Sequence, residues 1–244
     1  MKTHFAILFK SLFLGTITPL VISCTHGQTT ERLLPYIDTR MGTAASITHT
    51  AGMFGKHTEE YGQTLPAVLE PNGMNFWTPQ TQDTEQKCIA PYYYRDSLFQ
   101  GFRNSHWITG GCTQDYGSMT LSALFDSLRC IPEKRGTRFA HEQETATPSY
   151  YSVTLPEEHL QAEMTGRSRS AIFRFTYQKA GKAYLIVNPN SDEGEGYIEI
   201  DTLRKRIYGY NPVHRIYQGW GEPAGYSGHF MVDYQKEPCE FGTF

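Results

Sequence analysis

The sequence predicts an all-β protein, an antiparallel β-sandwich with long loops rich in aromatic residues and glycine. From Gly117 onward, short runs of β-branched and aromatic residues recur, and turn residues separate them. No segment keeps a 3.6-residue apolar period for long enough to indicate a confident helix. Aromatic residues make up 14% of the chain, a composition that suits β-structure and would also suit a carbohydrate-binding surface.

The expected strands are short and bounded by turn signals. They cover residues 118–125, 150–155, 160–165, 171–177, 183–187, 197–201, 205–210 and 229–234. Residues 172–177 (IFRFTY) alternate in part between apolar and polar, as a strand with one solvated face does. Turn-forming residues at 156–158, 181–182 and 203–204 separate neighbouring strands.

Residues 36–117 have a different character. They are rich in Gly, Pro, Thr, Asn and aromatic residues and contain few long apolar runs, so we expect mainly irregular structure there. The aromatic content argues against disorder. Long loops on a rigid sheet are where binding residues tend to lie.

The N-terminus has the pattern of an export signal. Lys2 and Lys10 precede or flank an apolar run, 12–22, that is shorter than the ~20 residues a membrane-spanning helix needs. The sequence VISC, which ends at Cys24, resembles a bacterial lipobox. We therefore expect a signal peptide at 1–23, a lipidated Cys24, a linker at 24–35 and a membrane-anchored lipoprotein of the periplasm or outer membrane. Plain cleavage near Ser23 is the alternative.

Charge and cysteines restrict the partners. The net charge is −3, the pI is about 6.3, and there is no basic block, so nucleic acid is not an expected partner. The four cysteines after Cys24 are Cys88, Cys112, Cys130 and Cys239. They allow three disulfide pairings that the sequence does not distinguish, and free thiols remain open.

Motifs for metal binding and for nucleophilic catalysis are weak. His49, His57, His106 and Cys112 follow no metal-binding spacing. Residues 188–199 (NPNSDEGEGYIE) faintly resemble a calcium loop, but the turn glycine is replaced and no helices flank them, so an acidic hairpin loop is favoured. The sequence has no G-x-S-x-G elbow, P-loop or dinucleotide fingerprint.

The most unusual stretch is 101–119, GFRNSHWITGGCTQDYGSM, which has the pattern of neither a strand nor a helix. Gly110 and Gly111 allow close backbone approach, His106 and Asp115 can bond hydroxyl groups, and Trp107 offers a face on which a sugar ring could stack. The alternative is a buried turn in which Trp107 belongs to the core and Asp115 caps the backbone. The residues alone do not decide between them.

Several motifs in the same order resemble the N-terminal domain of glycoside hydrolase family 92. They are YIDTRMGT, EYGQTLPAVLEPNGMNFWTPQT, the stretch GFRNSHWITGGCTQDYGSMTL and HEQETATPSYYSVTL, and the resemblance covers nearly all of residues 36–244. It implies a calcium-dependent, inverting exo-α-mannosidase that acts on mannose-containing glycans. In that family a large (α/α) barrel follows the sandwich and carries the general acid, the general base and the calcium ligands. The resemblance therefore implies a C-terminally incomplete domain at 36–244, without catalytic residues or metal ligands of its own.

The resemblance also implies a set of sugar-binding residues. The family segment that ends in Asp-Tyr-Gly lines the terminal mannose pocket, which here implies His106, Trp107, Cys112 and Asp115, with Gly110 and Gly111 shaping the loop. Many relatives place a bulky aromatic residue near the position of Cys112, so the resemblance does not specify which mannosidic linkage is preferred. A further family loop near the same cleft implies Gln63, Asn72 and Gly73.

Two other functions stay open. One is a stand-alone, non-catalytic carbohydrate-binding sandwich, which would be soluble and would saturate with mannosides. The other is a structural module whose aromatic loops form the interface with a partner domain and would leave an exposed apolar patch.

Overall fold

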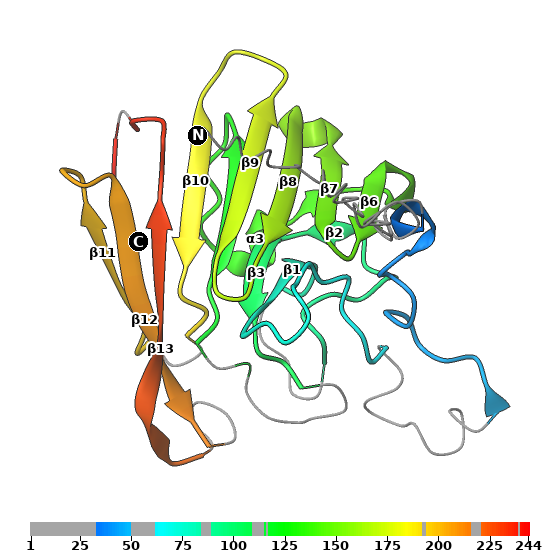
Figure 1. The fold of residues 1–244 in the computed structure, drawn as a ribbon. Helices are drawn as coiled ribbons and strands as arrows, with labels where there is room; N and C mark the ends of the chain where they lie inside the picture. The colour runs from blue at the N-terminus through cyan, green and yellow to red at the C-terminus, as the bar shows by residue number, and fades with distance from the viewer. Residues whose placement is uncertain are drawn as a thin grey trace, which may run out of the picture. The chain divides into compact units, whose positions relative to one another are not determined.

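The computed structural model describes residues 33–49, 62–83, 89–108, 115, 117–191, 194–215, 221–238 and 240–244, and antiparallel strands dominate them (Figure 1). The described helices are short: α3 (Pro132–Arg135) and the 3-10 turns η1 (Leu34–Tyr36), η3 (His141–Gln143) and η4 (Pro156–Glu158). The predicted all-β class is confirmed. Within the described ranges, no helix is long and apolar enough to cross a membrane.

One layer is the sheet β6-β7-β8-β9. Its strands are β6 (Glu144–Thr147), β7 (Tyr150–Leu155), β8 (Leu160–Gly166) and β9 (Ala171–Tyr177). The register explains its buried face, because Val153 pairs with Ala162, which in turn pairs with Phe175. Every second residue of β7, β8 and β9 thus points to one side, and these side chains are mostly apolar.

The other layer is the sheet β1-β3-β4-β10. It consists of β1 (Phe76–Gln80), β3 (Gly101–Ser105), β4 (Thr120–Phe125) and β10 (Ala183–Asn188). Two expectations are wrong here. Residues 101–105 form a regular strand, and the region 36–117 contributes strands to the sandwich. The polar side chains of Arg103, Asn104 and Ser105 hid the strand pattern, because they are buried and hydrogen-bonded.

Two smaller sheets complete the described fold. Strands β2 (Leu98–Phe99) and β5 (Thr137–Arg138) pair, and β11 (Tyr197–Asp201), β12 (Arg206–His214) and β13 (Pro223–Asp233) form a three-stranded sheet with a register shift near Pro212. The acidic segment after β10 leads from one sheet to another, so the expectation of a hairpin loop is wrong: β10 pairs with β4 and β11 pairs with β12.

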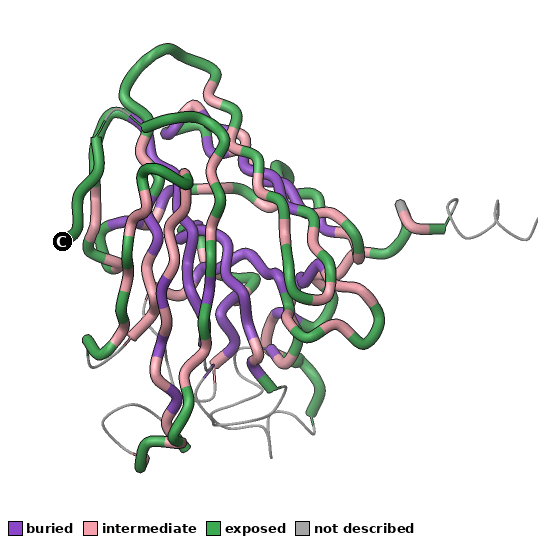
Figure 2. The backbone as a smooth tube through the Cα atoms, turned by 60° about the vertical axis from the view of Figure 1, so that its left-hand side comes forward, coloured by how far each residue is buried: buried purple, intermediate pink, exposed green. Residues whose placement is uncertain are grey.

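The main core lies between the two layers, where buried residues run through the middle strands (Figure 2). Phe102 is its centre: it is fully buried, its ring stacks on Phe173 with centroids 5.5 Å apart, and it meets Phe99 and Tyr151 edge-on. Such aromatic contacts add about 0.5–1.5 kcal/mol each beyond area burial. This core fixes β3 and therefore the starting point of the loop that follows it.

A second cluster joins the three-stranded sheet to the sandwich. Phe230 of β13 packs with Met119, Leu121 and Val187. Ile198, Ile207, Val232, Phe173 and Phe175 surround this cluster and are only partly buried. The inner faces of β11–β13 therefore contact both layers.

Strand positions from Tyr150 onward were largely predictable. The expected ranges 150–155, 171–177 and 197–201 coincide with β7, β9 and β11, whereas β12 and β13 are longer than expected. Cys130 is a half-buried free thiol, and the other three cysteines after Cys24 lie outside the described residues. Residues 1–32, with the predicted signal and Cys24, also lie outside them.

Gly228 of β13 requires the absence of a side chain. A Cβ atom at this position would lie 2.0 Å from the Cα of Gly117, which precedes β4. We expect Gly228→Ala to lower the free energy of unfolding by about 1–3 kcal/mol, because β13 must move away from the turn that holds Gly117. Gly242→Ala is the control, since nothing lies within 4 Å of its added Cβ. Chemical denaturation measures both, and equal stability of the two variants would contradict the close approach.

Candidate sugar-pocket wall and buried polar cluster

A buried carboxylate closes the base of the loop between β3 and β4. Asp115 Oδ2 accepts hydrogen bonds from Arg103 Nε at 3.0 Å and Ser105 Oγ at 2.7 Å, and Oδ1 accepts one from the His106 N–H at 2.6 Å. The Arg103 and Asp115 side chains are only 3% and 1% exposed. A buried ion pair whose carboxylate accepts further hydrogen bonds resists rearrangement, because moving either partner would leave a buried charge unpaired.

Further bonds tie the two ends of this loop together. The Trp107 N–H donates to Ser105 Oγ at 3.1 Å. On the returning side, Asn104 Nδ2 donates to the Gly117 carbonyl at 3.0 Å, and Asn104 Oδ1 accepts from the Met119 N–H at 2.6 Å. Polar side chains of β3 thus replace the sheet ladder at the point where the loop begins and ends.

The structure brings together three of the predicted pocket residues. His106 is half-buried at the start of the loop, and Trp107 and Asp115 are buried beneath it. Gly110, Gly111 and Cys112 lie outside the described residues. No observation on the chain tests their sugar-binding roles, which remain predictions.

The second predicted set lies on other segments. The Gln63 N–H donates to the Gly42 carbonyl at 3.0 Å. Asn72 is exposed with φ = 64°, in a turn closed by a bond from the Gly73 N–H to the Glu70 carbonyl. That turn contacts Ser168 of the β8–β9 connection, which fixes it to the sheet β6–β9.

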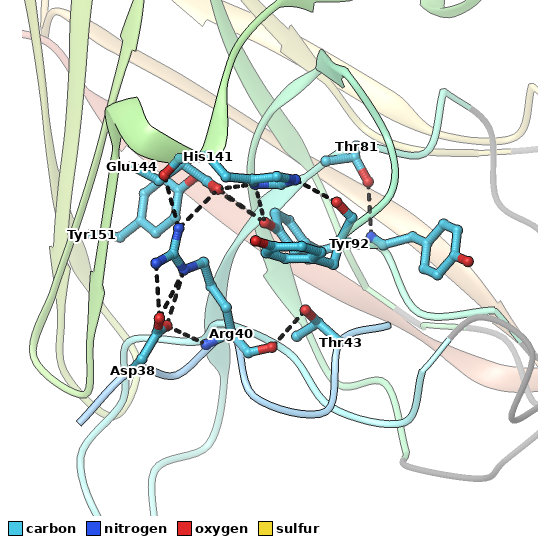
Figure 3. Close-up of polar contacts among 10 residues, drawn as sticks. Asp38, Arg40, Thr43, Thr81, Tyr92, His141, Glu144 and Tyr151 are labelled. Atoms are coloured by element: carbon cyan, nitrogen blue, oxygen red, sulfur yellow. Dashed lines mark hydrogen bonds and ion pairs between the residues drawn. The ribbon is translucent and has the colours of Figure 1, made fainter. Parts of the chain in front are cut away.

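A second polar cluster, which the sequence analysis missed, surrounds Glu144 (Figure 3). The Glu144 side chain is completely buried, and its carboxylate accepts hydrogen bonds from the hydroxyl groups of Tyr92 and Tyr151. His141 Nδ1 lies 2.5 Å from Glu144 Oε2, and Arg40 Nη1 lies 3.6 Å from the same oxygen. The one sign of this cluster in the sequence is Glu144 itself, an acidic residue at a buried position of β6. Strand alternation predicts an apolar residue at such a position.

The Glu144 cluster connects three distant segments of the chain. Arg40 is held by Asp38 through several bonds, including 2.8 Å from Nη2 to Oδ2, and donates to the His141 carbonyl at 2.9 Å. The His141 ring stacks on Tyr94, with centroids 3.9 Å apart, and its Nε2 contacts the Tyr94 carbonyl. The cluster therefore serves as a structural junction, because its polar groups are engaged with one another.

Burial sets the electrostatics of the two phenols. Desolvation, followed by the charge of Glu144, raises the pKa of Tyr92 and of Tyr151 well above the usual value. The hydrogen bond from Arg40 holds the pKa of Asp38 below its usual value. The phenols thus remain neutral donors to the carboxylate, as an ionised phenol beside Glu144 would add a second buried negative charge.

Arg135, the last residue of α3, is a further buried charged residue. It is 1% exposed, and none of its three guanidinium nitrogens has a hydrogen-bond partner within the described chain. Burial lowers its pKa to about 10, although Cys130 and Glu133 act in the opposite direction. Nothing in the described structure explains why this side chain is buried.

The described ranges contain no group of three or more His, Cys, Asp or Glu side chains that could hold a metal ion. In the acidic segment after β10, Asn190 Oδ1 accepts from Thr120 Oγ1 at 2.9 Å, and the Asn190 carbonyl accepts from Asn211 Nδ2 at 2.8 Å. These oxygen atoms are thus occupied by bonds within the protein.

The protein is a two-layer β-sandwich, and its candidate site lies on the connection between β3 and β4. The model of the glycosyl hydrolase family 92 N-terminal domain matches residues 36–244. The chain therefore belongs to glycosyl hydrolase family 92, and the matched region is the family's N-terminal domain. Among curated proteins, none matches the chain.

Solved structures of the family have a similar fold. A family GH92 inverting mannosidase from Bacteroides thetaiotaomicron is 31% identical, with a TM-score of 0.67, over 82% of this chain and 25% of that one. A second GH92 α-mannosidase from the same species is 23% identical, with a TM-score of 0.61 and the same coverage. The chain thus spans about a quarter of the length of these relatives.

We expect the buried Arg103–Asp115 pair to make a large contribution to the free energy of unfolding. We expect Asp115→Ala to lower the free energy of unfolding by about 3–5 kcal/mol, because Arg103 would remain buried without its carboxylate. The matched control is Asp233→Ala, which breaks the Arg206–Asp233 pair, whose side chains are 34% and 59% exposed. That change should cost at most about 1 kcal/mol. Similar losses in urea unfolding would contradict the assignment.

The two buried phenols predict a loss of stability in alkali. Their pKa values are raised in the folded state, so their stabilisation is fully present below pH 10 and falls as the pH rises above it, since only the unfolded chain then releases these protons. Each contributes a slope of about 1.4 kcal/mol per pH unit. Tyr92→Phe should reduce the slope of the free energy of unfolding against pH by about 1.4 kcal/mol per pH unit, and the double variant with Tyr151→Phe should reduce it by about twice as much. Urea unfolding between about pH 9 and 11.5 measures both slopes. An unchanged slope would contradict this.

Proposed function

We propose that this chain is the non-catalytic N-terminal part of an exported, calcium-dependent, inverting α-mannosidase that acts on mannose-containing glycans. In this proposal the loop after β3 forms one wall of the sugar pocket. Family membership supports it, together with the 31% identity to a protein described as an inverting mannosidase. The single structural observation that carries it is the anchoring of the loop by Asp115.

A sugar-binding wall needs a rigid base, and the loop after β3 has one. Asp115 and Trp107 are buried and hold the loop from inside, so they act by positioning. His106 follows directly on β3 and is half-buried, which leaves part of its side chain available to solvent. An imidazole can donate to and accept from neighbouring sugar hydroxyl groups.

Catalysis is assigned to the remainder of the enzyme. An inverting glycosidase uses one carboxylic acid to protonate the leaving oxygen and one carboxylate to activate water on the opposite face. Bound calcium would supply Lewis-acid and template effects. In this proposal the calcium ligands belong to the part of the enzyme that follows the matched domain. Export and a lipid anchor at Cys24 belong to the proposal on the strength of the N-terminal pattern alone.

The test is a mannosidase assay on two proteins. One is the chain itself. The other is a chimera in which the chain replaces the corresponding quarter of the 31%-identical relative. We expect calcium-dependent hydrolysis of α-mannosides by the chimera and none by the chain. Turnover by the chain alone, or a folded but inactive chimera, would overturn the proposal. Saturable mannoside binding by the chain, beside an inactive chimera, would favour a stand-alone binding module.

In the active chimera, His106→Ala should lower kcat/KM by about ten- to a hundred-fold, because one oriented contact to the sugar is lost. Its melting temperature should stay close to that of the parent. His229→Ala is the matched control, since His229 is an exposed histidine on β13. If both variants keep full activity, His106 does not contact the substrate.

A further inference from the structure

One edge of the sheet β6–β9 is free in the described structure. β9 pairs with β8, and no described strand pairs with its other edge. An exposed strand edge presents a row of backbone N–H and C=O groups that readily pair with another strand. The backbone N–H and C=O groups of β9 that do not bond to β8 point to this free edge.

The hydrogen-bond pattern at both ends of β9 identifies these groups. The Gln178 N–H donates to the His159 carbonyl at 2.7 Å, and the Arg167 N–H donates to the Ser170 carbonyl at 2.7 Å. Hydrogen-bonded pairs alternate along an antiparallel ladder, so both ends place the even-numbered residues of β9 in bonds to β8. The backbone groups of Phe173, Phe175 and Tyr177 therefore point to the free edge.

The core beside this edge is incompletely covered. Leu185 of β10 pairs with the core residue Ala123, so its side chain faces the core, yet it is 43% exposed. Phe173 and Phe175 also face the core and are only partly buried. On the three-stranded sheet, Ile207 and Val232 face the same cluster and are partly buried too.

The arrangement of the layers explains these exposures. In Figure 1, β10 and then β13, β12 and β11 lie to the left of β9, beyond the edge of the layer β6–β9. Of the described strands of that layer, β9 at its edge contacts the cluster around Phe230, through Phe173 and Phe175. A segment that paired with β9 would lie over Leu185, Ile207 and Val232 and would bury them.

We propose that the free edge of β9 accepts a β-strand from the polypeptide that follows this domain in the full-length family protein. The solved relatives extend far beyond the matched region, which is 25% of their length, so they have ample chain to supply a strand. The strand should alternate, with apolar side chains toward Leu185 and polar ones toward solvent. The inference rests on family membership and on the edge geometry, and not on the proposed mannosidase activity.

Amide hydrogen exchange, resolved to single residues, tests the proposal in the chain and in the chimera. In the chain, the amides of Phe173 and Phe175 should exchange fast, whereas those of Arg174 and Thr176 should be protected by β8. In the chimera, protection of Phe173 and Phe175 should rise at least about ten-fold, while Arg174 and Thr176 serve as internal controls. Unchanged exchange in the chimera would overturn the proposal. So would protection in the chain that grows with its concentration, which would indicate a second copy as the partner.

A lysine substitution gives an independent readout. Leu185→Lys should leave the melting temperature of the chain nearly unchanged, because a lysine stem can reach solvent through the uncovered side of the core. In the chimera it should abolish the added protection of Phe173 and Phe175. Ile172→Lys is the control, since Ile172 is 72% exposed and faces away from the core on β9. Full protection in the Leu185→Lys chimera would contradict the proposed strand. The mannosidase assay is read separately, so failure of one proposal does not imply failure of the other.

Discussion

The described fold depends on the apolar face that β7, β8 and β9 share around Phe102. Alternation places Val153, Ala162 and Phe175 on the same side in three neighbouring strands, and the opposing layer contributes Phe102 to meet them. A shift of one residue in any strand would turn its apolar residues to solvent, so this face sets the register. Because Phe102 belongs to β3, the same packing fixes where the loop with His106 begins.

Buried carboxylates extend this order from the strands to the loops. Asp115 is bonded by two residues of β3 and by the backbone of His106, and Glu144 joins segments that are far apart in the sequence. In both cases a single carboxylate accepts hydrogen bonds from several donors, some of them on irregular segments of the chain. Holding these segments in place therefore requires charged groups to be buried, and each buried charge must stay paired.

The sequence predicted most of the strands from Tyr150 onward, because β-branched and aromatic residues alternate there between turn residues. It failed for β1 and β3. In β3 the inward and outward positions are both buried, so the strand shows no alternation, and Arg103, Asn104 and Ser105 are polar because they bind the loop. A buried turn in which Asp115 caps the backbone was one of the two interpretations that the residues of this stretch left open, and Asp115 does accept the His106 N–H. The Glu144 cluster was not expected, because its members are separated by more than a hundred residues and no local pattern links Arg40 to His141.

The core next to β9 and the loop after β3 differ in how far the described domain stabilises them. A sandwich that was complete within the described chain would bury Leu185, Phe173 and Phe175, whose apolar surface contributes stability only when it is removed from water. The base of the loop after β3, in contrast, is held by hydrogen bonds that Asp115 accepts from Arg103, Ser105 and the backbone of His106. The base of the loop is thus held entirely by bonds within the described domain, whereas the apolar side chains beside β9 stay partly exposed to water.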